Sequence, residues 1–163
     1  LSQDFLVEFT LLAKTGGTTR STLGALEKLK GQSFDAVVTS LGVNDVTAGV
    51  GLTRWREQQS ALRTYLRESL GVQHIIVTGL PPVHGFPALP QPLRWYLGRR
   101  ASEFDTVLQQ DVAAEPGVHF VSLRFSQDVT LMAVDGFHPG PAIYREWARR
   151  ATDQIRAAYA TRA

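Results

Sequence analysis

Two residues near the C-terminus have the types and the spacing of an acid–base pair. Asp135 and His138 lie three residues apart in Asp-Gly-Phe-His-Pro-Gly, a glycine-containing segment just ahead of an expected helix. At this spacing the carboxylate can hold one ring nitrogen and leave the other to act as a general base. A lone histidine is usually structural, and the neighbouring aspartate favours a catalytic interpretation.

Two further segments could stabilise a developing negative charge. Asn44 follows a run of β-branched residues in Gly-Val-Asn-Asp, and an amide held at a strand end can donate to an oxyanion. An ordinary turn with an Asx-type hydrogen bond explains this segment about equally well. Gly16 lies in Lys-Thr-Gly-Gly-Thr-Thr, where N–H groups at a helix start suit an anion. A plain strand-to-helix turn is the commoner explanation of such a segment.

Strands and helices are expected to alternate along the chain. Four short apolar runs predict strands: Val7–Lys14, Ala36–Val43, His74–Leu80 and Val118–Leu123, of which the second and third are rich in β-branched residues. Amphipathic periodicity and caps predict helices from Thr18 or Thr19 to near Gly31, from Thr53 to Gly71, from Leu93 to Ala114, and from Pro141 onward. This alternation predicts an α/β fold, a three-layer α/β/α sandwich with a mainly parallel sheet. Neither a repeat nor a linker divides residues 1–163, so a single domain is expected.

In this order, the three segments resemble the motifs of the SGNH hydrolases, the GDSL-type esterases, lipases and thioesterases with a flavodoxin-like fold. Thr-Gly-Gly-Thr places Gly16 where the family has its oxyanion glycine, and Asn44 is similar to the asparagine of Gly-x-Asn-Asp. Asp135 and His138 resemble the Asp-x-x-His pair. The resemblance covers essentially the whole chain and implies ester hydrolysis by a Ser-His-Asp mechanism without a metal or organic cofactor.

The chain departs from this family at its first motif. No Gly-Asp-Ser occurs, and none of the nine serines has that setting; Ser40 lies in an expected strand and Ser21 in an expected helix. Leu1 is not typical of a translation start. We therefore expect the nucleophilic serine upstream of residue 1. We also expect an N-terminal segment or a second polypeptide to supply a missing central strand, since unpaired edges inside a sheet are costly.

The resemblance implies a small-molecule acyl ester or thioester substrate. The proline-stiffened segment after the third expected strand carries the candidate substrate-binding residues Phe86, Leu89, Trp95 and Tyr96. Short to medium acyl groups are the first expectation, and carbohydrate-linked acetyl groups are the second. Two other functions remain open: a non-catalytic binding domain that has lost the serine, and a phosphate- or nucleotide-binding module that uses the Thr15–Thr19 loop.

Composition excludes several other classes of protein. The net charge of +2, with no basic run interleaved with aromatic residues, argues against a nucleic-acid partner. The absence of cysteine excludes disulfides and thiolate metal sites but leaves the cellular compartment open. No run approaches the ~20 apolar residues of a membrane span.

Overall fold

A parallel sheet forms the centre of the molecule. The computed structural model describes residues 1–124 and 128–160. Strands β1 (Ala36–Ser40), β2 (His74–Thr78) and β3 (Val118–Val121) pair in parallel in the order β1-β2-β3. Strand β2 is buried along its whole length, as its continuous apolar sequence predicts.

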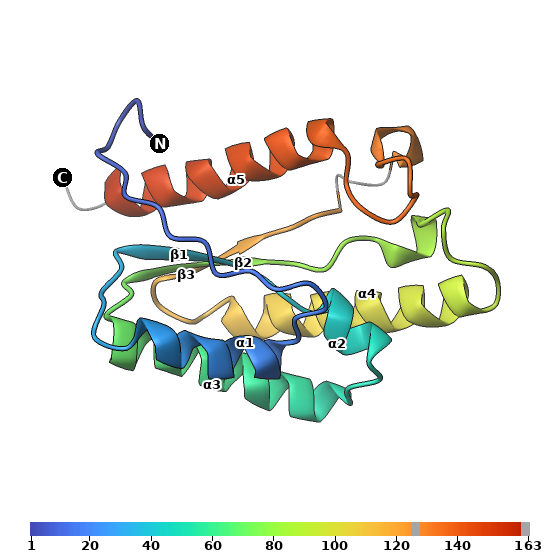
Figure 1. Cartoon of the computed structure of the whole chain (residues 1–163), viewed down its shortest axis with the longest axis horizontal. Helices are drawn as coiled ribbons and strands as arrows, with labels where there is room; N and C mark the ends of the chain where they lie inside the picture. The colour runs from blue at the N-terminus through green and yellow to red at the C-terminus, as the bar shows by residue number, and fades with distance from the viewer. Residues whose placement is uncertain (125–127, 161–163) are drawn as a thin grey trace.

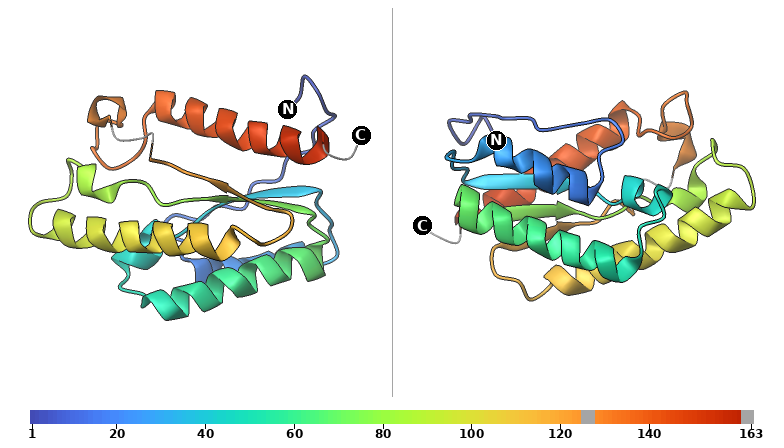
Figure 2. Two further views of the ribbon diagram at one scale, coloured as in Figure 1. Left: turned by 180° about the vertical axis from the view of Figure 1, so that it is seen from behind. Right: turned by 60° about the horizontal axis from the view of Figure 1, so that its bottom comes forward.

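Helices cover both faces of this sheet. Helices α1 (Thr19–Leu26), α3 (Leu52–Leu70) and α4 (Leu93–Val112) lie on one face, and α5 (Pro141–Ala160) lies on the other (Figures 1 and 2). The shorter elements are α2 (Val43–Thr47) and the 3-10 turns η1 (Glu27–Leu29), η2 (Val83–Gly85) and η3 (Val129–Leu131). The predicted three-layer α/β/α arrangement is confirmed.

Local signals in the sequence set several helix ends. Thr18 caps α1 through a capping box, in which its side chain accepts from the Ser21 N–H and its own N–H donates to the Ser21 hydroxyl. Gly71 ends α3 with a φ of 65°, in the left-handed region that favours glycine. Helix α3 begins at Leu52 with Gly51 as its cap, two residues before the predicted Thr53 cap. The strand expected over Ala36–Val43 ends at Ser40, and helix α2, which was not predicted, begins at Val43.

Two apolar layers hold the sandwich together. The larger lies between the sheet and α3 and α4, where the Trp55 and Phe104 rings pack with centroids 4.5 Å apart. On the other face, Ile76 and Val121 pack with Ala151 of α5. No helix of the described residues is long and apolar enough to cross a membrane.

The predicted strand over Val7–Lys14 is wrong. This segment is exposed along its length, with Val7, Phe9 and Leu11 at 44%, 78% and 74% exposure. Across the described chain, no hydrogen bond joins it to β1, although it runs on the β1 side of the sheet (Figures 1 and 2). A strand needs a neighbouring backbone to satisfy its N–H and C=O groups, and an apolar pattern alone does not supply one.

Candidate active site

The candidate residues lie on loops at one end of the sheet. The loops that follow the strands of a parallel sheet lie together at the carboxyl edge of that sheet. Ligands bind at this edge in folds of this kind. The segments that follow β1 and β2 and the loop that precedes α5 all lie at the right-hand end of the molecule in Figure 1. The segment after β1 carries Asn44, and the loop before α5 carries Asp135 and His138.

Asp135 and His138 form a close pair. His138 Nδ1 lies 2.6 Å from Asp135 Oδ2, so the predicted contact between these side chains is confirmed. The other carboxylate oxygen accepts hydrogen bonds from the Phe137 and His138 N–H groups, each at 2.9 Å. These three contacts fix the carboxylate in a tight local turn and orient the imidazole.

The charge on Asp135 determines which histidine nitrogen is available. Hydrogen bonds from the His138 backbone and side chain, followed by that from the Phe137 N–H, lower the pKa of Asp135 to about 2. An ionised carboxylate only accepts hydrogen bonds, so Nδ1 must carry the proton that it shares with Asp135. In the neutral ring, Nε2 then keeps its lone pair and can take a proton from a nucleophile. The His138 side chain is 65% exposed, which leaves this nitrogen accessible.

Core contacts hold the loop that carries the pair. The Phe137 ring meets the buried Phe86 edge-on, with centroids 5.3 Å apart. The Ala88 N–H donates to the Gly136 carbonyl at 3.2 Å, which ties this loop to the segment after β2. Phe137 therefore anchors the loop from inside while His138 next to it remains exposed.

Gly16 and Asn44 form a second group. The Asn44 side-chain amide donates to the Gly17 carbonyl at 2.9 Å, which uses one of its two hydrogens. Gly16 is exposed with a φ of 70°, and its N–H has no hydrogen-bond acceptor among residues 1–124 and 128–160. Gly42 has a φ of 128°, and a β-carbon there would lie 2.9 Å from Leu80 Cδ1, so the turn into α2 requires glycine.

A buried polar cluster behind these donors was not predicted. The Asp45 carboxylate and Thr19 are both fully buried, and the Thr19 N–H and hydroxyl donate to it at 3.1 and 3.0 Å. Burial raises the pKa of Asp45, and the hydrogen bonds from Thr19 oppose that rise. Trp55 and Gln59 complete the cluster; their spacing of four residues along α3 was the available signal in the sequence.

The structure places no described serine against His138. The Ser21 hydroxyl donates to the Thr18 carbonyl at 3.0 Å and accepts from the Thr18 N–H at 2.9 Å, so it serves the capping box. Ser40 is the last residue of β1 and is exposed. In the described part of the chain, no serine hydroxyl makes a hydrogen bond with His138.

The four candidate substrate-binding residues differ in exposure. Phe86 is 4% exposed and packs against Phe137, while Leu89 is half-buried against the core. Trp95 and Tyr96, on the first turn of α4, are 60% and 50% exposed. A role in substrate binding stays a prediction for all four residues.

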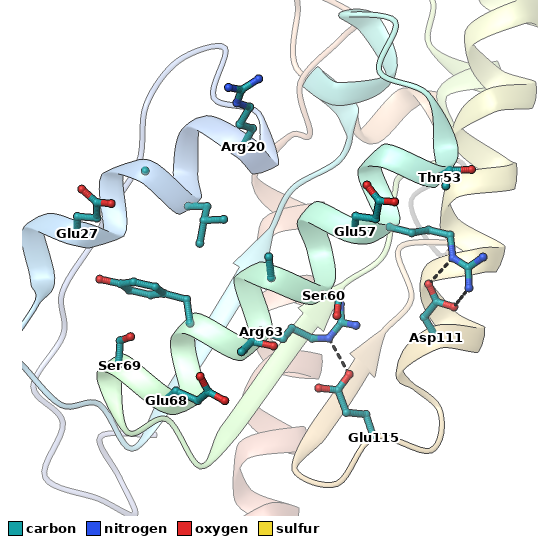
Figure 3. A pocket seen from close by; sticks show the side chains of 16 residues that line it. Arg20, Glu27, Thr53, Glu57, Ser60, Arg63, Glu68, Ser69, Asp111 and Glu115 are labelled. Atoms are coloured by element: carbon teal, nitrogen blue, oxygen red, sulfur yellow. Dashed lines mark hydrogen bonds and ion pairs between the residues drawn. The ribbon is translucent and has the colours of Figure 1, made fainter.

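An open hollow of about 1220 Å³ lies away from these residues, between α1, α3 and the end of α4 (Figure 3). Charged side chains line much of it, including the Arg63–Glu115 and Arg56–Asp111 pairs. None of the candidate catalytic residues borders this hollow. No group of three or more His, Cys, Asp and Glu side chains among the described residues could hold a metal ion.

The chain matches the model of the GDSL-like lipase/acylhydrolase family over residues 1–146. It belongs to that family. The family membership agrees with the Asp135–His138 pair and with the parallel sheet flanked by helices. No curated protein sequence matches the chain.

Solved structures share the GDSL fold with this chain at low identity. A candidate platelet activating factor from Streptococcus pneumonia has a TM-score of 0.72 and 19% identity over 85% of this chain and 68% of its own. The esterase EstA from Pseudoalteromonas sp., in a structure inhibited by monoethylphosphonate, has a TM-score of 0.57 and 20% identity. The match covers 88% of this chain and 74% of the esterase chain. The salicylyl-acyltransferase SsfX3 from a tetracycline biosynthetic pathway has a TM-score of 0.54 and 14% identity. The match covers 83% of this chain and 41% of the acyltransferase chain.

Proposed function

We propose that the protein is a serine ester hydrolase that acts on short to medium acyl esters or thioesters through a Ser-His-Asp mechanism. The observation that carries this proposal is the 2.6 Å contact between His138 Nδ1 and Asp135, with the imidazole otherwise exposed. Membership of the GDSL-like family supports the reaction class. The nucleophilic serine lies outside residues 1–163 in this proposal.

Each described group has a defined task in the proposed reaction. His138 Nε2 removes the proton of the attacking serine and later donates it to the leaving alcohol or thiol. Asp135 holds the ring and stabilises the imidazolium that forms. The Gly16 N–H and the second Asn44 amide hydrogen donate to the tetrahedral oxyanion, and each such donor commonly lowers the barrier by ~3 kcal/mol. Water then attacks the acyl-enzyme, with His138 again acting as the base.

The edge of β1 provides the place where the serine-bearing segment would join the fold. Strand β1 pairs with β2 on one side, and among the described residues its other edge has no partner. Val38 on this strand is 46% exposed, and the exposed apolar segment over residues 7–14 runs on the β1 side of the sheet (Figure 2). An added parallel strand would satisfy the backbone of β1 and cover both apolar surfaces. We propose that a segment N-terminal to residue 1 supplies this strand and carries the serine at its carboxyl end, with a second polypeptide as the alternative source.

A fluorophosphonate probe tests this assignment. The product of the natural gene is labelled, digested and examined by mass spectrometry to locate the modified serine. We expect the label on a peptide outside residues 1–163, and no labelling when His138 is replaced by alanine. A label on Ser21 or Ser40 would refute the proposed source of the nucleophile. A folded protein that takes up no label and hydrolyses no nitrophenyl ester would instead be a non-catalytic binding domain.

A further inference from the structure

The buried Asp45–Thr19 pair holds the start of α1. The Thr19 N–H lies 3.1 Å from each of the two carboxylate oxygens of Asp45, and the Thr19 hydroxyl donates to Oδ2 at 3.0 Å. Both residues have no solvent exposure. Because Thr19 is the first residue of α1, the carboxylate also neutralises the partial positive charge at that helix end.

Two residues of α3 fix the direction of these hydrogen bonds. Trp55 Nε1 donates to the Thr19 hydroxyl oxygen at 3.2 Å, and Gln59 Nε2 donates to the same oxygen at 3.0 Å. A hydroxyl has one hydrogen and two lone pairs, so its accepting capacity is filled. Its one hydrogen must therefore point to Asp45, which acts as an acceptor only. The cluster has one arrangement, and each of its members is buried.

Asp45 connects this cluster to the candidate oxyanion donors. Its chain neighbour Asn44 donates to the Gly17 carbonyl at 2.9 Å. Two consecutive residues thus hold the Gly16–Thr19 segment at two points, Asn44 at Gly17 and Asp45 at Thr19. The Gly16 N–H and the free Asn44 amide hydrogen come from segments that are far apart in the sequence. Their spacing depends on these two attachments.

We infer that Asp45 is a positioning residue that sets the distance between the Gly16 N–H and the Asn44 amide. This inference rests on the proposed function, in which those two groups bind the oxyanion. Asp45 itself is fully buried and acts through Thr19 and Asn44, without touching the substrate. An oxyanion site needs both donors correctly placed in the transition state, and a displacement of about 1 Å can cost ~100-fold in rate.

The Asp45→Asn variant is the test. It keeps the shape of the side chain, but in either orientation of the amide its NH₂ group faces a donor of Thr19: the backbone N–H, or the hydroxyl, which cannot accept a further hydrogen bond. In the product of the natural gene, we expect kcat to fall about 10- to 100-fold while KM changes less than threefold, because oxyanion donors act in the transition state. Asp111→Asn, at the distant Arg56 pair, is the matched control and should leave both constants unchanged.

Two further measurements separate positioning from stability alone. Thr19→Ser keeps the hydroxyl and should retain near-normal kcat. In an Asn44→Ala background, Asp45→Asn should cost several-fold less than it does alone, because one of the donors that it positions is already absent. A purely stabilising Asp45 would lower the urea midpoint but leave kcat per folded molecule unchanged, and that result would overturn the inference.

Amide hydrogen exchange provides a readout without turnover. Asp45→Asn should speed exchange at the Thr19 N–H and shift the NMR signals of the Gly16 N–H and the Asn44 side-chain amide, whereas Asp111→Asn should change none of them. If the unmodified protein hydrolyses no ester, the proposed function fails, and these signals alone decide whether Asp45 positions the two groups. Unchanged Gly16 and Asn44 signals in folded Asp45→Asn protein would refute the inference in either case.

Discussion

Replacing Thr19 by valine removes the hydroxyl at the centre of the buried cluster while nearly preserving the shape of the side chain. The change deletes three hydrogen bonds, one donated to Asp45 and two accepted from Trp55 and Gln59. Trp55 is fully buried and Gln59 is 3% exposed, so water cannot replace the lost partner. Asp45 keeps the hydrogen bond from the Thr19 N–H, so the weaker contact with this carboxylate contributes only a small part of the lost stability.

The expected destabilisation follows from these contacts. Each buried donor left without a partner costs about 1–3 kcal/mol, and the weakened carboxylate contact adds about 1 kcal/mol. With two such donors, Trp55 Nε1 and Gln59 Nε2, Thr19→Val should therefore lower the free energy of unfolding by about 3–7 kcal/mol. That is a large part of the 5–15 kcal/mol typical of a domain.

Urea unfolding followed by circular dichroism measures this loss on the product of the natural gene. With a slope of about 1–3 kcal/mol per molar urea, the midpoint should fall by at least ~1 M. Thr19→Ser is the control, since it keeps the hydroxyl and loses one buried methyl group, for a cost of about 1 kcal/mol. Equal midpoints for the valine and serine variants would show that the hydroxyl network does not stabilise the fold as we infer.

Three other predictions concern the site. In the complete enzyme, His138→Ala should lower nitrophenyl ester turnover by several orders of magnitude, and Asn44→Ala should lower it by about 100- to 1,000-fold. Near-normal turnover by the His138→Ala variant would exclude His138 as the base. Because the pKa of Asp135 is lowered to about 2, its contribution to stability should be present in full above its ordinary value of 3.8 and be lost as the pH falls through about 2. Carbon NMR of the Asp135 carboxyl group should show that midpoint, and one near 3.8 would contradict the hydrogen bonds from His138. Residues 1–163 produced alone should be poorly soluble and inactive, and a soluble, monomeric, active product would place the nucleophile among the nine serines of this chain.

Local sequence patterns determined most of the secondary structure and the contact between Asp135 and His138. Alternating β-branched and amphipathic runs predicted the strands at Ala36, His74 and Val118, and caps such as Gly71 marked helix ends. Asp135 and His138 could be paired from the sequence because both lie in one tight turn, where a spacing of three residues brings them within reach.

The tertiary structure decided what depends on partners far away in the chain. Val7–Lys14 has the composition of a strand but forms none, because no neighbouring backbone pairs with it among the described residues. The Asp45 cluster joins α1, α2 and α3 through hydrogen bonds across 26 to 40 residues, and no local pattern could show that they meet. Periodicity and caps act over a few residues, whereas strand pairing and the hydrogen bonds of buried polar groups are fixed only when the whole chain packs.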